Sequence, residues 1–209
     1  AGWRINEESF MDNISAFDNL KLRFSWGQLG NQNIGLYTFL NNLNLNQGII
    51  LNNSVTSGSA ITALSDPDIS WEKTTLTNIG LDVSLWKSFL EINIDVFNKY
   101  TSDILTRINV PAQVGNLSGP MTNLYDMSNK GVEIAASHSN MIGNFTYKIA
   151  GQIGFVKNIV EYMSGDEQYT TNRYGPIRLI KTGYPINSWY GYQADGIFQT
   201  AEEVENHAF

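Results

Sequence analysis

The feature that most constrains this chain is an alternation of apolar and polar residues, unbroken over 79–85 and 90–96, within the two neighbouring segments 77–86 and 89–100. Alternation with a period of two is typical of β-strands that have one apolar and one polar face. With a two-residue turn at 87–88, Leu85 lies opposite Leu90, and each residue of the alternating apolar row on one arm then meets a residue of the apolar row on the other. We therefore predict a long antiparallel hairpin in this register, which also pairs Val83 with Ile92, Leu81 with Ile94 and Ile79 with Val96.

The second arm of this hairpin is long enough to bear on function. At ~3.3 Å per residue and a tilt of about 40°, the segment 89–100 rises roughly 28 Å. That rise is close to the ~25 Å apolar band of a β-barrel in an outer membrane. The length of the arm therefore favours a strand that crosses a membrane.

The same alternation recurs in the segments 20–26, 132–137 and 145–155. The last two segments predict a second hairpin around residues 140–143, with Ala136 opposite Tyr147. In that register Lys148 lies diagonal to Glu133 on the polar face, within reach of a cross-strand ion pair.

The connections between these strands differ greatly in length. The turns at 87–88 and 140–143 are short, whereas the segments 30–75, 101–129 and 158–188 are long and rich in Asn, Ser, Gly and Thr. Structureless loops of this length are uncommon in a compact soluble domain. Transmembrane barrels regularly alternate short periplasmic turns with long extracellular loops, so the pattern favours a barrel.

Composition excludes several other classes of protein. No segment has the ~20 consecutive apolar residues of a transmembrane helix, although 42% of the 209 residues are hydrophobic. The chain contains no cysteine, which excludes disulfides, thiol catalysis and cysteine-based metal sites. A net charge of −7 argues against a nucleic-acid partner.

Aromatic residues lie at the predicted strand ends. Trp86 and Phe89 flank the first turn, and Tyr100 closes the other end of the second arm. Trp and Tyr at both edges are typical of a membrane barrel. A soluble β-sandwich whose core is capped by aromatic residues would show the same pattern, so these residues alone leave both folds open.

Catalysis finds little support in the sequence. His138 and His207 are far apart, and His138 falls on an apolar face beside a turn. No HExxH, GxSxG or phosphate-binding glycine loop is present. We expect no catalytic residues, no metal site and no cofactor.

Several motifs together resemble those of SusC/RagA-type TonB-dependent transporters. Residues 20–32 resemble the family's "LKLRxSYGxTGNQ", and residues 66–82 are similar to "NPDLKWEKTxxxNIGLD". Residues 95–105 resemble "DYYxKxTxDLL", and residues 129–133 match "NKGVE". Residues 183–203 resemble "GxPxGxxYGYxxDGIFQxxEE". The matches follow the family's order over nearly the whole chain.

The resemblance implies an all-β fold, an antiparallel up-and-down transmembrane β-barrel with long extracellular loops and short periplasmic turns. Residues 1–209 would be part of the C-terminal barrel, a partial arc of about six or seven strands. The plug domain, a signal peptide and the closing strands would be absent, leaving an open, curled sheet. The resemblance further implies a location in the cell outer membrane of a Gram-negative bacterium, in contact with lipid.

The family resemblance also implies partners and sites. The transporter would import oligosaccharides or peptides with a SusD-like surface lipoprotein as lid, powered by the TonB complex through the plug. The polar faces would line the lumen through Arg23, Asp82, Glu91, Asp95, Glu133 and Lys148. Loop aromatics would contact the substrate or the lid, namely Tyr37, Trp71, Tyr125, Tyr174, Trp189, Tyr190 and Tyr192.

Two other functions stay open at this point. A soluble carbohydrate-binding β-sandwich would place the same polar residues in solvent and use the aromatics to stack on sugars. The aromatics could equally pack long loops against their neighbours. A secreted β-rich enzyme would need a convergent pair of acids, which the sequence does not offer.

Overall fold

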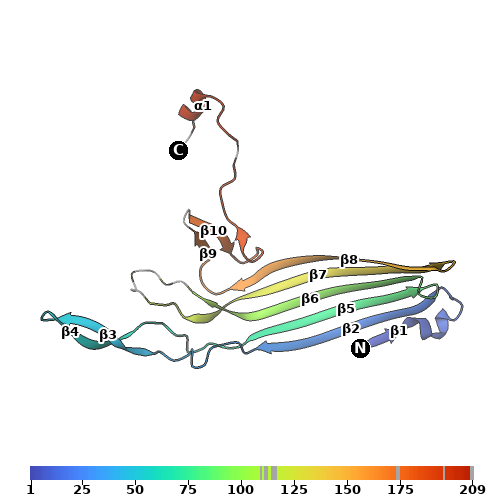
Figure 1. The fold of residues 1–209 in the computed structure, drawn as a ribbon, viewed down its shortest axis with the longest axis horizontal. Helices are drawn as coiled ribbons and strands as arrows, with labels where there is room; N and C mark the ends of the chain where they lie inside the picture. Colours follow the sequence, from blue (N-terminus) through green and yellow to red (C-terminus); the bar gives the residue numbers. More distant parts are fainter. Residues whose placement is uncertain (109, 111–112, 114–116, 173–174, 195, 208–209) are drawn as a thin grey trace.

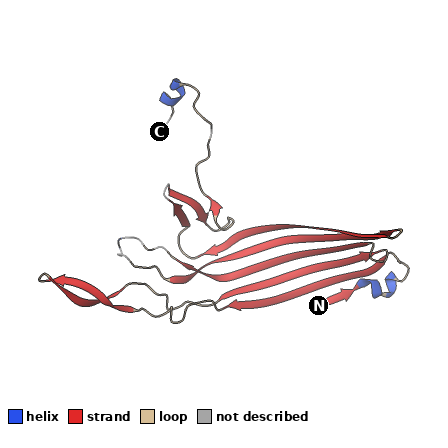
Figure 2. Ribbon diagram, in the orientation of Figure 1, coloured by secondary structure: helices blue, strands red, loops and turns tan. Residues whose placement is uncertain are grey.

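The fold is taken from a computed structural model, which describes residues 1–108, 110, 113, 117–172, 175–194 and 196–207. It consists almost entirely of strands (Figures 1 and 2). Two 3₁₀ helices, η1 (Ile5–Glu7) and η2 (Ser9–Met11), and one short helix, α1 (Ala201–Glu205), complete it. The strands are β1 (Gly2–Arg4), β2 (Phe17–Asn31), β3 (Leu43–Leu51), β4 (Ser54–Ile61), β5 (Glu72–Leu85), β6 (Leu90–Arg107), β7 (Met121–Ile142), β8 (Phe145–Met163), β9 (Gln168–Asn172), β10 (Gly175–Ile180) and β11 (Ser188–Trp189).

The main element is an antiparallel sheet of six strands in the order β1-β2-β5-β6-β7-β8. Figure 1 shows its long strands lying side by side, with the short turns at one end and the long connections at the other. The predicted register of the first hairpin is confirmed, from Leu85 opposite Leu90 through to Ile79 opposite Val96. This sheet is open, because β1 and β8 each have only one neighbour among the described strands.

The first hairpin turns through Trp86–Phe89 in a backbone conformation that suits a twisted hairpin. Lys87 and Ser88 both have positive φ angles, of 60° and 62°. Positive φ at both central residues matches the right-handed twist of the flanking strands, although Asn-Gly is the usual choice there. The Ser88 amide donates to Asp18 Oδ2 over 2.9 Å, which helps to hold the turn against the start of β2.

The register predicted for the second hairpin is wrong by four residues. Ala136 lies opposite Gly151 rather than Tyr147, and Tyr147 lies opposite Asn140. The strands continue to Ile142 and Phe145, so the turn is the pair Gly143 and Asn144 rather than residues 140–143. A shift by an even number of residues keeps each side chain on its face, so the alternation could not detect the error.

All three segments predicted as long loops contain strands. β6 continues to Arg107 and β7 begins at Met121, so most of the segment 101–129 extends the main sheet. The segment 30–75 contains the separate hairpin β3–β4, and the segment 158–188 contains β9 and β10. The short turns nevertheless share one end of the sheet and the long connections the other, as predicted.

The two faces of the main sheet differ sharply in character. One face carries the apolar rows, including Leu22, Leu81, Ile94, Ile134 and Ile153. Many of these side chains are exposed, with Ile79 at 50%, Val96 at 48% and Phe155 at 64%. Within the part of the chain that the structure describes, no second sheet packs on this face. The described helices include none long and apolar enough to cross a membrane.

A small buried core lies instead at the end of the sheet that carries the long connections. Leu124, Tyr125 and Val160 are buried there, and Ile180 and Ile186 pack against them. The Val160 amide donates to the Tyr184 carbonyl oxygen over 3.0 Å and the Gly183 amide donates to the Val160 carbonyl oxygen over 2.8 Å, which fixes the connection after β10 to this end of β8. The sheet β9–β10–β11 is thereby held at this end, above β7 and β8 in Figure 1.

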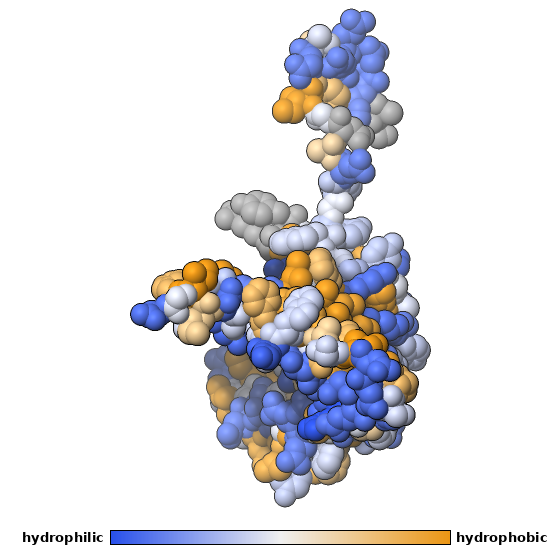
Figure 3. All heavy atoms as spheres, turned by 90° about the vertical axis from the view of Figure 1, so that its right-hand side faces the viewer, coloured by the Kyte–Doolittle hydropathy of each residue, from blue (hydrophilic) through white to orange (hydrophobic). Residues whose placement is uncertain are grey.

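The C-terminal segment stands apart from the rest of the chain. Figure 3 shows it clear of the sheet on a narrow stretch of chain, while hydrophobic side chains reach the surface over parts of the main body. Its helix α1 is capped by Thr200, whose hydroxyl accepts a hydrogen bond from the Glu203 amide over 3.2 Å.

Two glycines on the polar face test how closely the strands are packed. A Cβ at Gly131 would lie 2.6 Å from Phe97 Cζ and 2.7 Å from the Phe155 carbonyl oxygen. We expect Gly131→Ala to lower the free energy of unfolding by about 1–3 kcal/mol, because the backbone oxygen cannot move aside. Equilibrium unfolding in urea measures this change in free energy.

The matched control is Gly154→Ala on β8, where the nearest atom to the new Cβ, Glu133 Cγ, lies at an ordinary 3.5 Å. This variant should have the same free energy of unfolding as the parent chain. Equal losses of stability in the two variants would contradict the close packing of Phe97 over Gly131.

Candidate functional site

The candidate site is the polar face of the main sheet together with the aromatic residues at the end that carries the long connections. The registers of β2, β5, β6, β7 and β8 place all the residues predicted to face the lumen on this one face, opposite the apolar rows. These residues are Arg23, Asp82, Glu91, Asp95, Glu133 and Lys148. That they border a water-filled passage stays a prediction.

Arg23 links three strands at the centre of this face. Its Nε donates to Asp82 Oδ2 over 2.8 Å and its Nη2 donates to Asp95 Oδ2 over 3.0 Å. Asp95 also accepts from Asn78 Nδ2 over 2.9 Å. Gly80 lies opposite Arg23 in the register, and a Cβ there would come within 2.5 Å of the guanidinium carbon. The missing side chain is what lets the guanidinium lie across β5.

A second ion pair lies nearer the short turns. Lys148 Nζ lies 3.3 Å from Glu91 Oε2, and the Ser137 hydroxyl donates to the same carboxylate oxygen over 3.0 Å. The predicted pairing of Lys148 with Glu133 is therefore wrong. The physical reason is the corrected register, which places Lys148 opposite Ser139 and away from Glu133.

Between these ion pairs the polar face is hollowed. A cavity of about 310 Å³ has Asn93, Asp95, Glu133 and Gln152 in its lining. Small residues on this face, Gly154 and Ala135, leave the space open. The hollow offers carboxylate and amide groups to water or to a polar partner.

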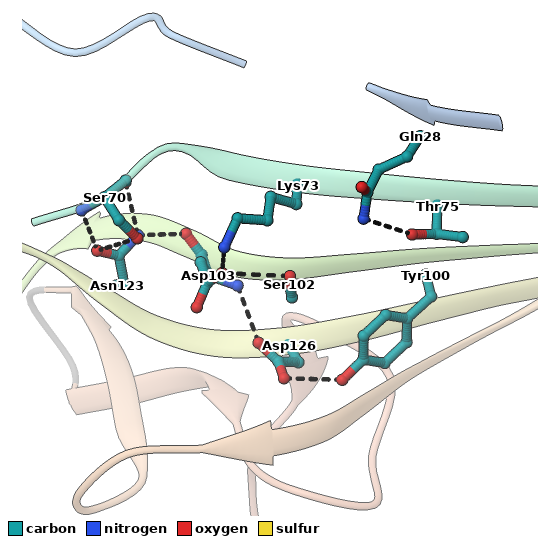
Figure 4. A network of polar contacts seen from close by, with 9 residues as sticks. All are labelled: Gln28, Ser70, Lys73, Thr75, Tyr100, Ser102, Asp103, Asn123 and Asp126. Atoms are coloured by element: carbon teal, nitrogen blue, oxygen red, sulfur yellow. Dashed lines mark hydrogen bonds and ion pairs between the residues drawn. The ribbon is translucent and has the colours of Figure 1, made fainter. Parts of the chain in front are cut away.

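A polar network closes the sheet at the end with the long connections (Figure 4). Asn123 donates through Nδ2 to the Ser70 and Asp103 carbonyl oxygens, over 2.9 and 2.6 Å. The Asp103 amide donates to Asp126 Oδ1 over 2.9 Å, and Asp103 has a positive φ of 59° at an irregularity in the β6–β7 ladder. The network joins β6 and β7 to the segment that leads into β5, beyond the apolar rows.

Tyr100 belongs to this network and does not end its strand. Its hydroxyl donates to Asp126 Oδ2 over 2.7 Å, and β6 continues to Arg107 (Figure 4). The expectation that Tyr100 closes the strand is therefore wrong. Tyr100 does lie where the apolar rows of β6 give way to polar side chains, since Asn98 and Ser102 share its face.

The predicted aromatics gather partly on the small sheet β9–β10–β11. Trp189 is 80% exposed, and the Arg178 guanidinium lies 5.2 Å from its ring centre. Tyr190 meets Tyr169 edge to face, with 5.2 Å between ring centroids. Such aromatic pairs bury area at low entropic cost and suit recognition.

The electrostatics of this small sheet centre on one ion pair. Glu167 is paired with Lys181, and the Tyr169 hydroxyl also donates to Glu167 over 2.8 Å. The Lys181 ammonium and the Tyr169 hydroxyl hold the pKa of the Glu167 carboxyl below its usual value. Glu167 in turn raises the pKa of Lys181. Both groups therefore carry their charges at neutral pH.

The other predicted aromatics are scattered. Tyr37 lies in a turn with a positive φ of 61°, Trp71 precedes β5, and Tyr192 follows β11; all three are exposed. The placement of Tyr125 in a loop is wrong, since it lies in β7 and is buried among apolar neighbours. Tyr174 lies outside the described residues.

Sequence reasoning missed the residues that complete the aromatic sheet. Arg178, Lys181 and Glu167 join Trp189, Tyr190 and Tyr169 only through the pairing of β9, β10 and β11. The sequence signal for β10 is a short alternation around residues 177–180. It covers too few residues to distinguish a strand from a loop. Among the described residues, no group of three or more His, Asp or Glu side chains could hold a metal ion.

Comparison with known proteins decides the family. The sequence profile described as "TonB dependent receptor-like, beta-barrel" matches residues 2–200, nearly the whole chain. The chain belongs to the TonB-dependent receptor β-barrel family. The predicted fold class, an arc of an antiparallel transmembrane β-barrel, is thereby confirmed.

Curated relatives agree with this assignment. The chain is 31% identical over 202 residues to TonB-dependent receptor P39 of Formosa agariphila, covering 96% of this chain and 19% of that protein. It is 28% identical to TonB-dependent receptor SusC of Bacteroides thetaiotaomicron, covering 92% of this chain and 20% of that protein. The chain thus spans about a fifth of the length of these relatives.

Solved structures show the same fold. The structure of the RagAB peptide transporter superposes with a TM-score of 0.76 at 22% identity, over 90% of this chain and 20% of that one. The open-open state of the RagAB peptide importer gives a TM-score of 0.74. The prediction of a SusC/RagA-type TonB-dependent receptor sequence is confirmed by these matches together.

The contribution of the central ion pairs to stability can be measured. Removing the guanidinium in Arg23→Met leaves Asp82 and Asp95 without their shared cation. We expect the free energy of unfolding in urea to fall by about 2 kcal/mol, since hydrogen bonds to charged groups are lost and like charges remain.

Lys148→Met is the matched control, because it also removes one cation from this face but from a more exposed pair. The free energy of unfolding should fall clearly less in this variant, as is usual for exposed ion pairs. A stability of Arg23→Met equal to that of the parent receptor would show that Arg23 does not hold the three strands together.

Proposed function

We propose that this chain forms one arc of the C-terminal barrel wall of an outer-membrane nutrient transporter driven by TonB. Its apolar face meets lipid, and its charged face borders the passage through the barrel. The short turns lie in the periplasm and the long connections outside the cell, as in other outer-membrane barrels.

The observation that supports this proposal most directly is the exposure of an apolar sheet face behind a polar face whose central charges are paired. Phe155, Ile153 and Val96 are all about half exposed or more. Exposed apolar areas of this extent mark contact with a membrane or another protein. Arg23, Asp82 and Asp95 meanwhile pair with one another on the opposite face, as groups in an aqueous passage can.

The soluble β-sandwich is the rival that the same side chains first allowed. A sandwich buries the apolar face of one sheet against a second sheet, about 10 Å away. In the described residues the smaller sheets β3–β4 and β9–β10–β11 are separate from the main sheet, and the apolar rows stay exposed. The fold therefore favours the membrane barrel over the sandwich.

The proposed cargo is an oligosaccharide or a peptide, taken up together with a SusD-like lipoprotein that closes the mouth. The relative SusC is named a TonB-dependent receptor, and RagAB is described as a peptide transporter. The exposed aromatics at the end with the long connections suit contact with such a substrate or lid. These contacts would come from Trp189 and Tyr190, together with Tyr37, Trp71 and Tyr192.

The membrane topology can be tested by chemical labelling, because this chain contains no cysteine. Asn93 and Ile94 are neighbours on β6 that point to opposite faces. In intact receptor in native outer membranes, we expect a water-soluble maleimide to label Asn93→Cys and to leave Ile94→Cys unlabelled until the membrane is dissolved and the protein denatured, because maleimides react with the thiolate, which does not form in an apolar environment. The unsubstituted receptor gives the background.

The labelling result discriminates between the folds. Rapid reaction of Ile94→Cys with the water-soluble reagent would place the apolar face in water and contradict the transporter wall. Protection of Asn93→Cys from the same reagent would contradict a water-filled passage on the polar face.

The aromatic contact can be tested by truncation. In the complete receptor, Trp189→Ala with Tyr190→Ala should weaken binding of the substrate or of the lipoprotein roughly tenfold or more, since exposed aromatic anchors dominate such interfaces. Binding of oligosaccharides, peptides and the lipoprotein can each be followed by calorimetry.

Trp86→Ala is the matched control, since Trp86 is also exposed but lies at the opposite end of the sheet beside a short turn. It should leave these affinities unchanged. Unaltered binding of all three ligands in the double variant would remove the small aromatic sheet from the proposed contact surface.

A further inference from the structure

Strand β8 defines an apolar band of the thickness of a membrane. On the face opposite Gln152, every second residue from Phe145 to Phe155 is apolar or Tyr, with Gly151 as the one small residue. Ten residue steps at ~3.3 Å and a tilt of about 40° rise roughly 25 Å, the height of the apolar band of an outer-membrane barrel. The next residue on this face is Lys157.

A second lysine lies directly beside the first. Lys130 on β7 is the register partner of Lys157, and the next pair toward the short turns is Val132 with Phe155. Both lysines are exposed. The apolar band therefore ends on both strands at the same step, with two ammonium groups on neighbouring strands. Like charges directly opposite each other destabilise a sheet unless an anion offsets them.

The described residues offset this charge only in part. Lys130 Nζ lies 3.7 Å from Glu161 Oε1, and that carboxylate also accepts a hydrogen bond from the Ser128 hydroxyl. Among the described side chains, no carboxylate lies within 4.0 Å of Lys157 Nζ. Two cations therefore share one carboxylate at the edge of the band.

We propose that Lys130 and Lys157 together bind the phosphate group of an anionic lipid in the outer leaflet, with its acyl chains lying along Phe155 and Ile153. Lipid phosphates lie at the level where an apolar band ends, and basic side chains at that level attract anionic head groups. The long connections, and so this edge, face the outside of the cell in the proposed topology. The inference rests on the proposed function, because it needs the apolar face to meet lipid.

The test uses the complete receptor in phosphatidylcholine vesicles, with a bimane label attached at Phe155→Cys, next to the lysines. Lipids with brominated acyl chains quench the label when they lie beside it. We expect brominated phosphatidic acid to quench at several-fold lower mole fraction than brominated phosphatidylcholine, since each lysine near an anionic lipid contributes a factor of about five. Raising the salt to about 1 M should reduce this preference by screening.

The variant Lys130→Gln with Lys157→Gln should lose the preference for phosphatidic acid, while retaining quenching by both lipids. Lys99→Gln is the matched control, since Lys99 is an exposed lysine of β6 on the opposite face. It should keep the preference. A preference for phosphatidic acid that survives in the double variant would overturn the proposal, as would equal quenching by the two lipids in the parent receptor.

Failure of the proposal and failure of the proposed function give different results. If neither brominated lipid quenches the label, the apolar face does not meet lipid and the transporter wall itself is contradicted. If both lipids quench it equally, the face meets lipid but the two lysines do not select an anionic lipid.

Discussion

The structure depends on hydrogen bonding between long strands that keep one face apolar from the short turns to the step at Val132 and Phe155. An apolar medium tolerates the backbone only where every amide and carbonyl group is paired, and ladders on both sides of β5, β6 and β7 provide that pairing in the middle of the sheet. Because side chains alternate, the same ladders must present a second face with different chemistry. The apolar rows and the Arg23–Asp82–Asp95 cluster are thus two consequences of one register.

The charged face shows how a sheet can hold ion pairs without a core around them. Gly80 gives the Arg23 guanidinium room to cross β5, and Gly131 gives room to the Phe97 ring. Ring-over-glycine packing of this kind also pins the register of the strands. Where the apolar rows end, polar contacts around Asp103, Asn123 and Asp126 take over and allow β6 and β7 to continue beyond the band. The aromatic sheet β9–β10–β11 is anchored to this end through Val160 and Tyr184.

Sequence patterns predicted the first hairpin correctly because its turn and its alternation agree on one register. For the second hairpin the sequence patterns predict the correct face for each side chain but not which residues pair. Two registers that differ by four residues both keep Ile134 on the apolar face, and only the Gly143–Asn144 turn distinguishes them. Asn-rich segments such as 101–129 were mistaken for loop because polar strands outside an apolar band lose the alternation that marks a strand. For the same reason Tyr125 was placed in a loop although it is a core residue.

The sequence by itself determined the period of the strands, the division of side chains between two faces and, through the order of its motifs, the family. These properties depend on residues that are close along the chain, so local alternation predicts them. Only the tertiary structure decided which charges meet, since Arg23 reaches residues 59 and 72 positions away and Lys148 pairs with Glu91 across an intervening strand. It also decided that Lys130 and Lys157 lie side by side, because contacts between distant segments depend on registers and turns that alternation leaves undetermined.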